Sequence, residues 1–576
     1  MPKSYKSFLA SFFVLTFALL FTGCAKSEKL STQNRQFEEM TYNLFCQEIA
    51  GNTISLHYTL QNPEAYGIES VVPTFGTISA DHTESGMALE NTLAAVKRFD
   101  DTTLSEDNQL TKAVLKEYLE DSLHGLQYTL YQEPLSTVNG VQSQIPVLLS
   151  EFRMESKEDV EMYLELMDTL PAYFQSVIAF EKEKAEAGLF MSDAVAKQVI
   201  AQCQAFLDMG NSNYLISTFV DKVKNMEELD GGARDIYIEE NAKAVTETMT
   251  GAYKNLKHSM EALMGKGGNN AGLCYFPEGQ QYYSYLATRQ TGSDHTILEL
   301  KAMTKAQILD DLTAMEGELG LETAVQISES NAISMLNDLQ EKSGNAFPQS
   351  PDSNAQIKYV PESMESVLSP AFYMIPPIDN ISENVIYINQ SQVQNQLSLY
   401  TTLAHEGYPG HLYQTTYFAS QDPDEIRSIL DYGGYTEGWA TYAEMMSYYL
   451  APITDTQAML CQKNASIILG LYALADIGIH YDGWQREDAL KFFMAYGIGD
   501  ENVVSEIYDL ILGDPGNYLK YYIGYLEILS IKKDAMQRLG KTFSQKAFHE
   551  VVLRTGPAPF EIVRGQVDQW IISGQE

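Results

Sequence analysis

Residues 405–411 read His-Glu-Gly-Tyr-Pro-Gly-His, so two imidazoles flank a carboxylate within seven residues. A second acidic stretch, Glu-Gly-Trp-Ala-Thr-Tyr-Ala-Glu, follows at residues 437–444. Two imidazoles and one carboxylate form a ligand set of catalytic zinc sites, and a glutamate beside the first imidazole is the usual base in metal-dependent peptide hydrolysis. The residue types therefore predict metal-assisted hydrolysis.

The spacing of the two histidines requires a break in the helix. They are six positions apart, and on an unbroken α-helix their side chains would point roughly 240° apart. The glycines of the tract at 407–410 tolerate unusual backbone angles, and its proline moves the preceding residue away from helical geometry. We therefore predict that the helix ends or bulges across 407–410 and that the chain returns His411 toward His405.

Each histidine and glutamate of these two stretches has a predicted role. His405 and His411 are the first two metal ligands, Zn²⁺ is the expected ion, and Glu437 is the third ligand. Glu444 competes for the third place, but we assign it to a position beside an imidazole, which it would orient. Glu406 is the predicted general base, which takes a proton from the attacking water.

Beyond these residues, the segment 405–411 resembles the His-Glu-x-x-Pro-Gly-His signature of a large bacterial family labelled a domain of unknown function and grouped with the gluzincin metallopeptidases. Further segments similar to that family are residues 55–58, 435–440, 476–480, 521–524 and 548–550. More distantly, the chain is similar to the Taq-type carboxypeptidases and angiotensin-converting enzyme. The resemblance implies a large, mainly α, two-lobed helical fold with a deep central groove that would exclude folded proteins.

Two residues in the family-like segments are candidates to stabilise an oxyanion, a role that needs hydrogen-bond donors besides the metal. They are His480 and Tyr521, with Tyr518 and Tyr522 as near alternatives to the tyrosine. For His480, a buried histidine bonded to a backbone carbonyl is an equally good interpretation.

The elements that position these residues are predicted to be mostly helices. Residues 435–449 fit a helix that places Glu437 and Glu444 on one face. Residues 372–377 and 384–389 read instead as two short strands around a loop, forming a small hairpin or sheet before the metal helix. The resemblance implies an edge strand beside the metal, which would place Asn389 near substrate; the alternative is a hairpin that only covers the core.

The rest of the chain is predicted to be mainly helical. Residues 156–159 resemble a capping box before an apolar stripe with helical spacing, and Pro171 is predicted to interrupt that helix or start a turn. The Gly- and Asn-rich stretch 265–270 is the best candidate for a break between lobes, near 265–272. We predict one intertwined unit over residues 37–576.

Composition excludes several classes of function. The 576 residues include 77 acidic and 38 basic side chains, a net charge of −39. Nucleic acid binding needs a cationic face, and anionic lipid headgroups would repel such a chain. There is also no Gly-x-Ser-x-Gly motif, phosphate-binding loop or dinucleotide fingerprint.

The amino-terminal segment has the pattern of a secretion signal. Two lysines precede an apolar run at residues 8–21, too short to span a membrane, and Phe-Thr-Gly-Cys follows. These four residues resemble a bacterial lipobox, which implies a signal peptide at 1–23, lipidation of Cys24 and a polar tether at 24–36. The alternative is an ordinary signal peptide with an incidental cysteine. We therefore expect an extracytoplasmic lipoprotein of the bacterial cell membrane. Its only expected contact with the membrane is the lipid anchor at Cys24.

These expectations favour zinc-dependent hydrolysis of short peptides. Carboxypeptidase, dipeptidase and oligopeptidase actions all remain open. A zinc amidase acting on cell-wall fragments is a second enzymatic interpretation. The non-enzymatic alternative is a lipid-anchored peptide- or solute-binding protein whose metal site does no catalysis.

Overall fold

The computed structural model describes residues 32–574, except 70, 225, 318–324, 326, 352, 361–364, 366 and 367. The predicted signal peptide and Cys24 lie outside the described residues. The helices of the first half are α2 (Thr32–Ala50), α3 (Thr53–Thr59), α4 (Thr83–Lys97), α5 (Glu106–Gly125), α6 (Val141–Glu151), α7 (Lys157–Glu186), α8 (Asp193–Met209), α9 (Tyr214–Val223), α10 (Gly231–Lys243), α11 (Thr250–Leu263) and α12 (Gly279–Thr291).

The second half is also helical, apart from three short strands. It contains α13 (Ile297–Met315), α14 (Ala332–Ser343), β1 (Asn354–Tyr359), β2 (Ala371–Met374), β3 (Glu383–Ile388), α15 (Gln396–Glu406), α16 (His411–Ala419), α17 (Gly433–Ser447), α18 (Asp455–Ile477), α19 (Arg486–Ala495), α20 (Glu501–Gly513), α21 (Asn517–Leu539), α22 (Gln545–Thr555) and α23 (Phe560–Ser573). The predicted mainly α fold with a small sheet is confirmed.

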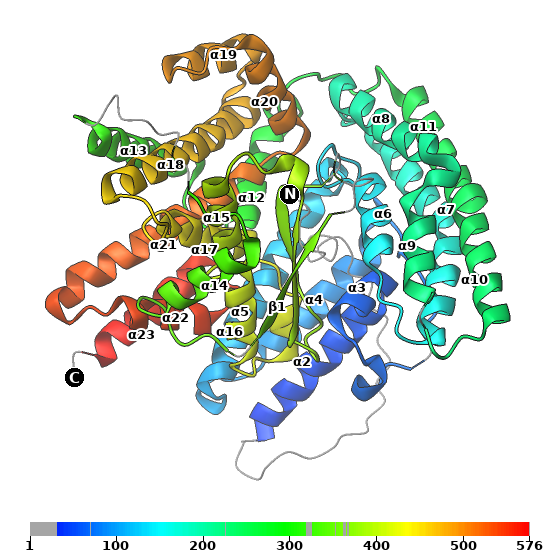
Figure 1. Cartoon of the computed structure of the whole chain (residues 1–576), viewed down its shortest axis with the longest axis horizontal. Helices are drawn as coiled ribbons and strands as arrows, with labels where there is room; N and C mark the ends of the chain where they lie inside the picture. The colour runs from blue at the N-terminus through cyan, green and yellow to red at the C-terminus, as the bar shows by residue number, and fades with distance from the viewer. Residues whose placement is uncertain are drawn as a thin grey trace.

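Two large hydrophobic clusters organise the described chain. Helices α6 to α11 form one of them, the cyan-to-green group in Figure 1. Helices α2, α4 and α5 join α12 and most of the helices that follow it in the other, whereas α19 and α20 pack with α18 in a third, smaller cluster. The chain passes from the first cluster to the second between α11 and α12, and residues of the sheet and its connections later return to the first. The two clusters are therefore not the two halves of the sequence, because the amino-terminal helices pack with the carboxy-terminal ones.

The three-stranded sheet lies between these clusters. Its order is β1-β3-β2, with β1 parallel and β2 antiparallel to β3. Side chains alternate between the two faces of a strand. Phe372 and Tyr387 accordingly pack into the first cluster, and Tyr373 and Ile386 pack into the second. The two predicted strands are confirmed as β2 and β3, whereas the exposed strand β1 was not predicted.

Helix α7 confirms one local prediction and corrects another. Ser156 caps it, and Asp159 completes the predicted capping box. Pro171 does not interrupt the helix but lies inside it, with its side chain exposed. An internal proline costs about 3 kcal/mol. Leu170 and Phe174 are fully buried on either side of it, so packing on both sides outweighs the lost hydrogen bond.

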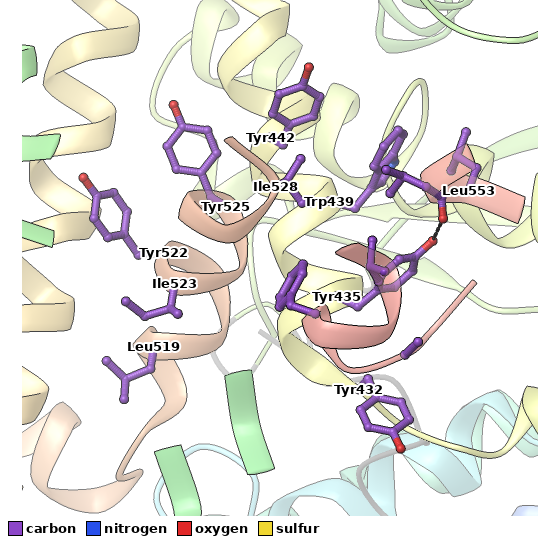
Figure 2. Packing of buried hydrophobic residues seen from close by; sticks show 14 of the residues in the cluster. Tyr432, Tyr435, Trp439, Tyr442, Leu519, Tyr522, Ile523, Tyr525, Ile528 and Leu553 are labelled. Carbon is purple, nitrogen blue, oxygen red and sulfur yellow. Dashed lines mark hydrogen bonds between the residues drawn. The ribbon is translucent and has the colours of Figure 1, made fainter. Parts of the chain in front are cut away.

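Helices α17 and α21 pack backbone against backbone (Figure 2). A Cβ atom added to Gly438 would lie 2.4 Å from the carbonyl carbon of Gly524. The two glycines belong to two of the segments singled out in the sequence, Tyr-Thr-Glu-Gly-Trp-Ala and Tyr-Tyr-Ile-Gly. Their contact places residues near the start of α21 beside Glu437.

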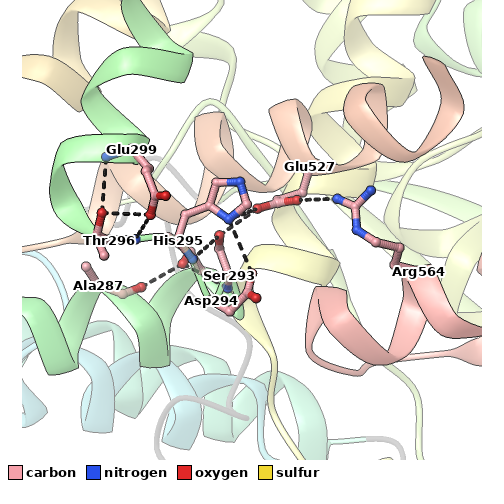
Figure 3. Close-up of polar contacts among 9 residues, drawn as sticks. Ala287, Ser293, Asp294, His295, Thr296, Glu299, Glu527 and Arg564 are labelled. Carbon is pink, nitrogen blue, oxygen red and sulfur yellow. Dashed lines mark hydrogen bonds and ion pairs between the residues drawn. The ribbon is translucent and has the colours of Figure 1, made fainter. Parts of the chain in front are cut away.

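A buried carboxylate fixes α21 to its neighbours (Figure 3). Glu527 of α21 is 1% exposed and accepts a hydrogen bond of 2.5 Å from Ser293 Oγ, in the connection between α12 and α13. Arg564 of α23 donates to its other oxygen at 3.2 Å. Since a buried charge is costly unless paired, these contacts fix α21 against both elements.

One helical stretch among the described residues, Asp455–Asp482, is long and apolar enough to cross a membrane. The protein buries 61% of its most apolar window. That burial is typical of the core helix of a folded protein.

Candidate metal centre

The helix carrying His405 breaks where the sequence predicts it. Helix α15 ends at Glu406 and α16 begins at His411, so residues 407–410 form the connection. A Cβ atom on Gly410 would lie 1.9 Å from the carbonyl oxygen of His405, and one on Gly407 would lie 2.8 Å from that of Leu403. The connection thus needs glycine at both ends, because it folds directly against the last turn of α15.

The break brings the three predicted ligands together. The distance from His405 Nε2 to Glu437 Oε2 is 3.6 Å, and from His411 Nε2 to the same oxygen 3.3 Å. The candidate ligand atoms all lie within 4.8 Å of one another. Ligands about 2.0–2.2 Å from a tetrahedral ion would be about 3.3–3.6 Å apart. The His-His-Glu group could therefore bind a metal ion with little rearrangement.

Two of these ligand atoms have no hydrogen-bond partner among the described residues. His405 Nε2 and Glu437 Oε2 are both buried and unsatisfied. Buried polar atoms in folded proteins are nearly always hydrogen-bonded, so an orphaned pair needs an explanation. A cation between the two rings and the carboxylate would satisfy both atoms at once. The donor set thus fits a metal.

The other ring nitrogen of His405 is held by Glu444. The distance from His405 Nδ1 to Glu444 Oε2 is 3.0 Å, the contact predicted for a carboxylate that orients an imidazole. Burial by itself would lower the pKa of His405, but the carboxylates of Glu437 and Glu444 outweigh burial and raise it to about 10. The negative field at this ring favours a cation.

Glu406 lies between the metal-ligand group and the sheet. The backbone N–H of Tyr373 in β2 donates to Glu406 Oε2 at 2.9 Å. Burial raises the pKa of Glu406, and the nearby imidazoles of His405 and His411 oppose that rise. The contact fixes the orientation of the carboxylate and puts the edge strand β2 directly beside it.

Helix α21 places two further side chains beside the metal-ligand group. Tyr521 lies with its ring centre 6.3 Å from that of His405, and a hydrogen bond links its side chain to Glu437. Burial and the negative charge of Glu437 raise the pKa of Tyr521. Lys520 Nζ lies 3.7 Å from Glu437 Oε1. Sequence reasoning missed Lys520; a lysine directly before Tyr-Tyr-Ile-Gly in a mostly apolar helix is the signal that could have found it.

His480 is not brought to the metal-ligand group. It is 1% exposed, in the short π-helical segment Gly478–Asp482 that follows α18. Its Nδ1 accepts from the N–H of Leu273 at 3.2 Å, and its Nε2 lies 3.0 Å from the carbonyl oxygen of Ile511. Burial lowers its pKa to about 4. With both nitrogens bonded to backbone, His480 matches the structural interpretation, and the predicted oxyanion role is withdrawn.

Asn389 likewise has a structural role. It is fully buried at the end of β3, and its Nδ2 donates at 2.7 Å to the carbonyl oxygens of Glu365 and Leu368. These contacts hold the segment that leads into β2. A side chain so enclosed is not available to substrate, so the prediction for Asn389 is wrong. The strand beside Glu406 is β2, whereas Asn389 follows the central strand β3.

Solved structures share the fold. A candidate lipoprotein from Colwellia psychrerythraea is similar with a TM-score of 0.83 and 19% identity, over 94% of this chain and 99% of that one. A candidate lipoprotein of unknown function from Shewanella oneidensis has a TM-score of 0.60 and 16% identity over the same shares. An oligoendopeptidase F candidate from Bacillus anthracis reaches a TM-score of only 0.31, at 10% identity over 84% of this chain and 96% of that one.

No curated protein matches the chain. The family model described as "Bacterial protein of unknown function (DUF885)" matches residues 75–321 and 322–567. These two ranges include the metal-ligand group and most of both hydrophobic clusters. The chain therefore belongs to the DUF885 family.

Proposed function

We propose that this protein is a zinc-dependent peptidase that hydrolyses short peptides. The observation that carries the proposal is the convergence of His405, His411 and Glu437, with orphaned ligand atoms, directly beside the buried carboxylate of Glu406. Catalytic zinc sites use three protein ligands and leave a fourth position for water or substrate. Three ligands are what the described residues offer.

The metal would be held by the Nε2 atoms of the two imidazoles and by a Glu437 oxygen. Two nitrogen ligands and one carboxylate favour zinc over magnesium or calcium, which prefer oxygen ligands alone. When bound, zinc supplies a Lewis acid that polarises a carbonyl and lowers the pKa of a water ligand to about 7.

Glu406 acts as the general base. Its carboxylate, held at Oε2 by the N–H of Tyr373, accepts a proton from the attacking water and passes it to the leaving amine. A fixed carboxylate needs no reorientation during this transfer, which lowers the entropic part of the barrier. The Tyr521 hydroxyl donates to the oxyanion that forms on the scissile carbonyl.

The position of strand β2 favours a peptide as the substrate. It is an edge strand of the sheet, and its Tyr373 already directs a backbone N–H toward the site rather than toward β3. An extended peptide can add to such an edge through backbone hydrogen bonds. A peptide aligned along β2 would pass Glu406 and the metal ligands with its backbone, so recognition would depend little on its side chains.

We place the protein outside the cytoplasm, on a lipid anchor. The support is the lipobox-like sequence ending at Cys24 and the two similar structures that are described as candidate lipoproteins. The net charge of −39 would keep the folded domain away from anionic headgroups, so the anchor would be its membrane contact.

The test compares three proteins on a library of short peptides, with products identified by mass. Wild type should cleave with zinc, lose cleavage with a chelator and regain it when zinc is restored. Glu406→Gln should keep stoichiometric zinc and lose at least 10³-fold in rate. Glu341→Gln, an exposed glutamate of α14, is the matched control and should behave as wild type.

The outcomes separate the rival functions. Zinc binding and peptide binding without cleavage would favour a binding protein, and cleavage confined to cell-wall fragments would favour an amidase. Cleavage that a chelator leaves unchanged, or a Glu406→Gln variant with near-normal rate, would contradict the proposal. The product masses also show whether cleavage starts at the carboxyl end, as in a carboxypeptidase, or inside the peptide.

A further inference from the structure

The connection between α15 and α16 contains one backbone carbonyl, that of Pro409, whose hydrogen-bond donor comes from neither of these two helices. A helix break leaves backbone carbonyls without their usual partners. The Gly407 oxygen accepts from the N–H of Tyr413 at 3.2 Å, and the Gly410 oxygen accepts from that of Gln414 at 2.8 Å. The Pro409 oxygen instead accepts from the indole N–H of Trp439, at 2.9 Å. That bond joins the connection to α17.

The two ends of this hydrogen bond are close in sequence to two metal ligands. Pro409 lies two residues before His411, and Trp439 lies two residues after Glu437. The bond therefore links the segment that sets the position of the second ligand to the helix that carries the third. A shift of one segment relative to the other would change the distance of 3.3 Å between His411 Nε2 and Glu437 Oε2.

The indole itself is held in place. Trp439 is fully buried, with edge-to-face contacts to Phe347 at 5.9 Å and to His549 at 5.6 Å between ring centres. His549 stacks on Phe347 at 4.2 Å and uses both its nitrogens, one with the Tyr442 hydroxyl and one with the Ala346 carbonyl, each at 2.8 Å. Residues from α22 and from the segment after α14 thus fix the direction of the indole N–H.

We propose that Trp439 is a positioning residue of the metal centre, which holds His411 at bonding distance from an ion shared with Glu437. The inference rests on the proposed metal site and assigns the residue that sets its geometry. Residues that orient metal ligands typically change metal affinity by about 10–100-fold when they are replaced. The loss of this N–H should therefore weaken zinc binding more than it weakens the fold.

The test is Trp439→Phe, which removes the N–H and keeps an aromatic ring. The matched control is Tyr435→Phe on the same helix (Figure 2). Tyr435 is also fully buried, and its hydroxyl donates to a backbone carbonyl at 2.8 Å, but that carbonyl belongs to Val552 of α22. Both variants lose one buried bond to a carbonyl, and only Trp439→Phe loses the bond to the histidine-bearing connection.

Zinc affinity is measured by competition with a chelator, and ligand geometry by the visible spectrum of the cobalt-substituted protein. We expect Trp439→Phe to bind zinc about tenfold or more weakly with a shifted cobalt spectrum, and Tyr435→Phe to match wild type in both. Phe347→Leu, which loosens the clamp on the indole, should give a smaller loss of affinity and is the second variant if Trp439→Phe does not fold.

Two results would overturn the inference, and they are distinguishable. If wild type binds zinc and both Trp439→Phe and Phe347→Leu match its affinity and spectrum, Trp439 does not position the centre, while the proposed metal site stands. If wild type binds no zinc, the proposed function fails and the inference fails with it.

Discussion

Gly438→Ala is predicted to damage the site through the backbone. The new Cβ atom would lie 2.4 Å from the carbonyl carbon and 2.5 Å from the Cα atom of Gly524, where ordinary contact begins at 3.4 Å. Helices α17 and α21 would have to separate by about 1 Å. Neither contact involves a flexible side chain, so the cost should reach the upper part of the overpacking range, about 3 kcal/mol.

The same displacement affects function. It moves Glu437 relative to Tyr521 on one side and to the two histidines, carried by α15 and α16, on the other. A misplacement of about 1 Å can cost about 10²-fold in rate. We therefore expect Gly438→Ala to lower the melting temperature by about 3 °C, from the unfolding entropy of a chain of this size, and to reduce peptide cleavage by about 10²-fold.

Gly251→Ala provides the matched control. Gly251 is an exposed glycine in a helix, α11, and an added Cβ atom would meet nothing within 4 Å. Alanine is favoured over glycine inside a helix by up to about 1 kcal/mol, so this variant should be slightly more stable than wild type and fully active. Thermal unfolding and initial rates measured side by side decide the matter. If Gly438→Ala proves as stable and active as Gly251→Ala, the reasoning from close helix approach is wrong.

Three further outcomes are expected. Glu444→Gln should keep the fold but bind zinc about 10–100-fold more weakly in chelator competition, because the amide orients His405 less strongly than the carboxylate does; unchanged affinity would contradict that role. Zinc at about 1,000 times its dissociation constant should stabilise the protein by about 4 kcal/mol, seen as a higher melting temperature that a chelator reverses. Burial raises the pKa of Glu181 to about 8, so between about pH 4.5 and 8 the folded state holds a proton that the unfolded state releases, and stability should fall as pH rises through that window. Glu181→Gln should make this fall less steep in denaturation curves measured across pH, although other buried carboxyls such as Glu48 and Asp476 still contribute to it, and Glu183→Gln, exposed on the same helix, should leave it unchanged.

The parts of the site and of the fold that depend on local sequence could be predicted. The end of α15 follows from a glycine-proline-glycine tract, whose backbone preferences act within a few residues. The face shared by Glu437 and Glu444 follows from helical periodicity, and the start of α7 follows from a capping box. In each case the cause and the effect lie within about one or two turns of chain, so no knowledge of distant segments is needed.

Other predictions failed because local sequence does not encode the deciding contact. The roles of His480 and Asn389 were expected from the family resemblance, but each side chain is enclosed by backbone groups from other segments. Pro171 was predicted to break a helix that packing on both sides preserves. The sequence of strand β1 shows little alternation of apolar and polar residues, because most of its residues are exposed. It is a strand because it pairs with β3.

The sequence by itself determined which residues could bind a metal and where the helix between the histidines must break, since both depend on residue type and short-range backbone preference. Only the tertiary structure decided that Glu437 reaches the two imidazoles, that Lys520 and Tyr521 lie beside it, and that Trp439 ties α17 to Pro409. These contacts join segments separated by about 30 to 80 residues of chain, and they form because α17 packs on α21 through two glycines and also packs closely against α15.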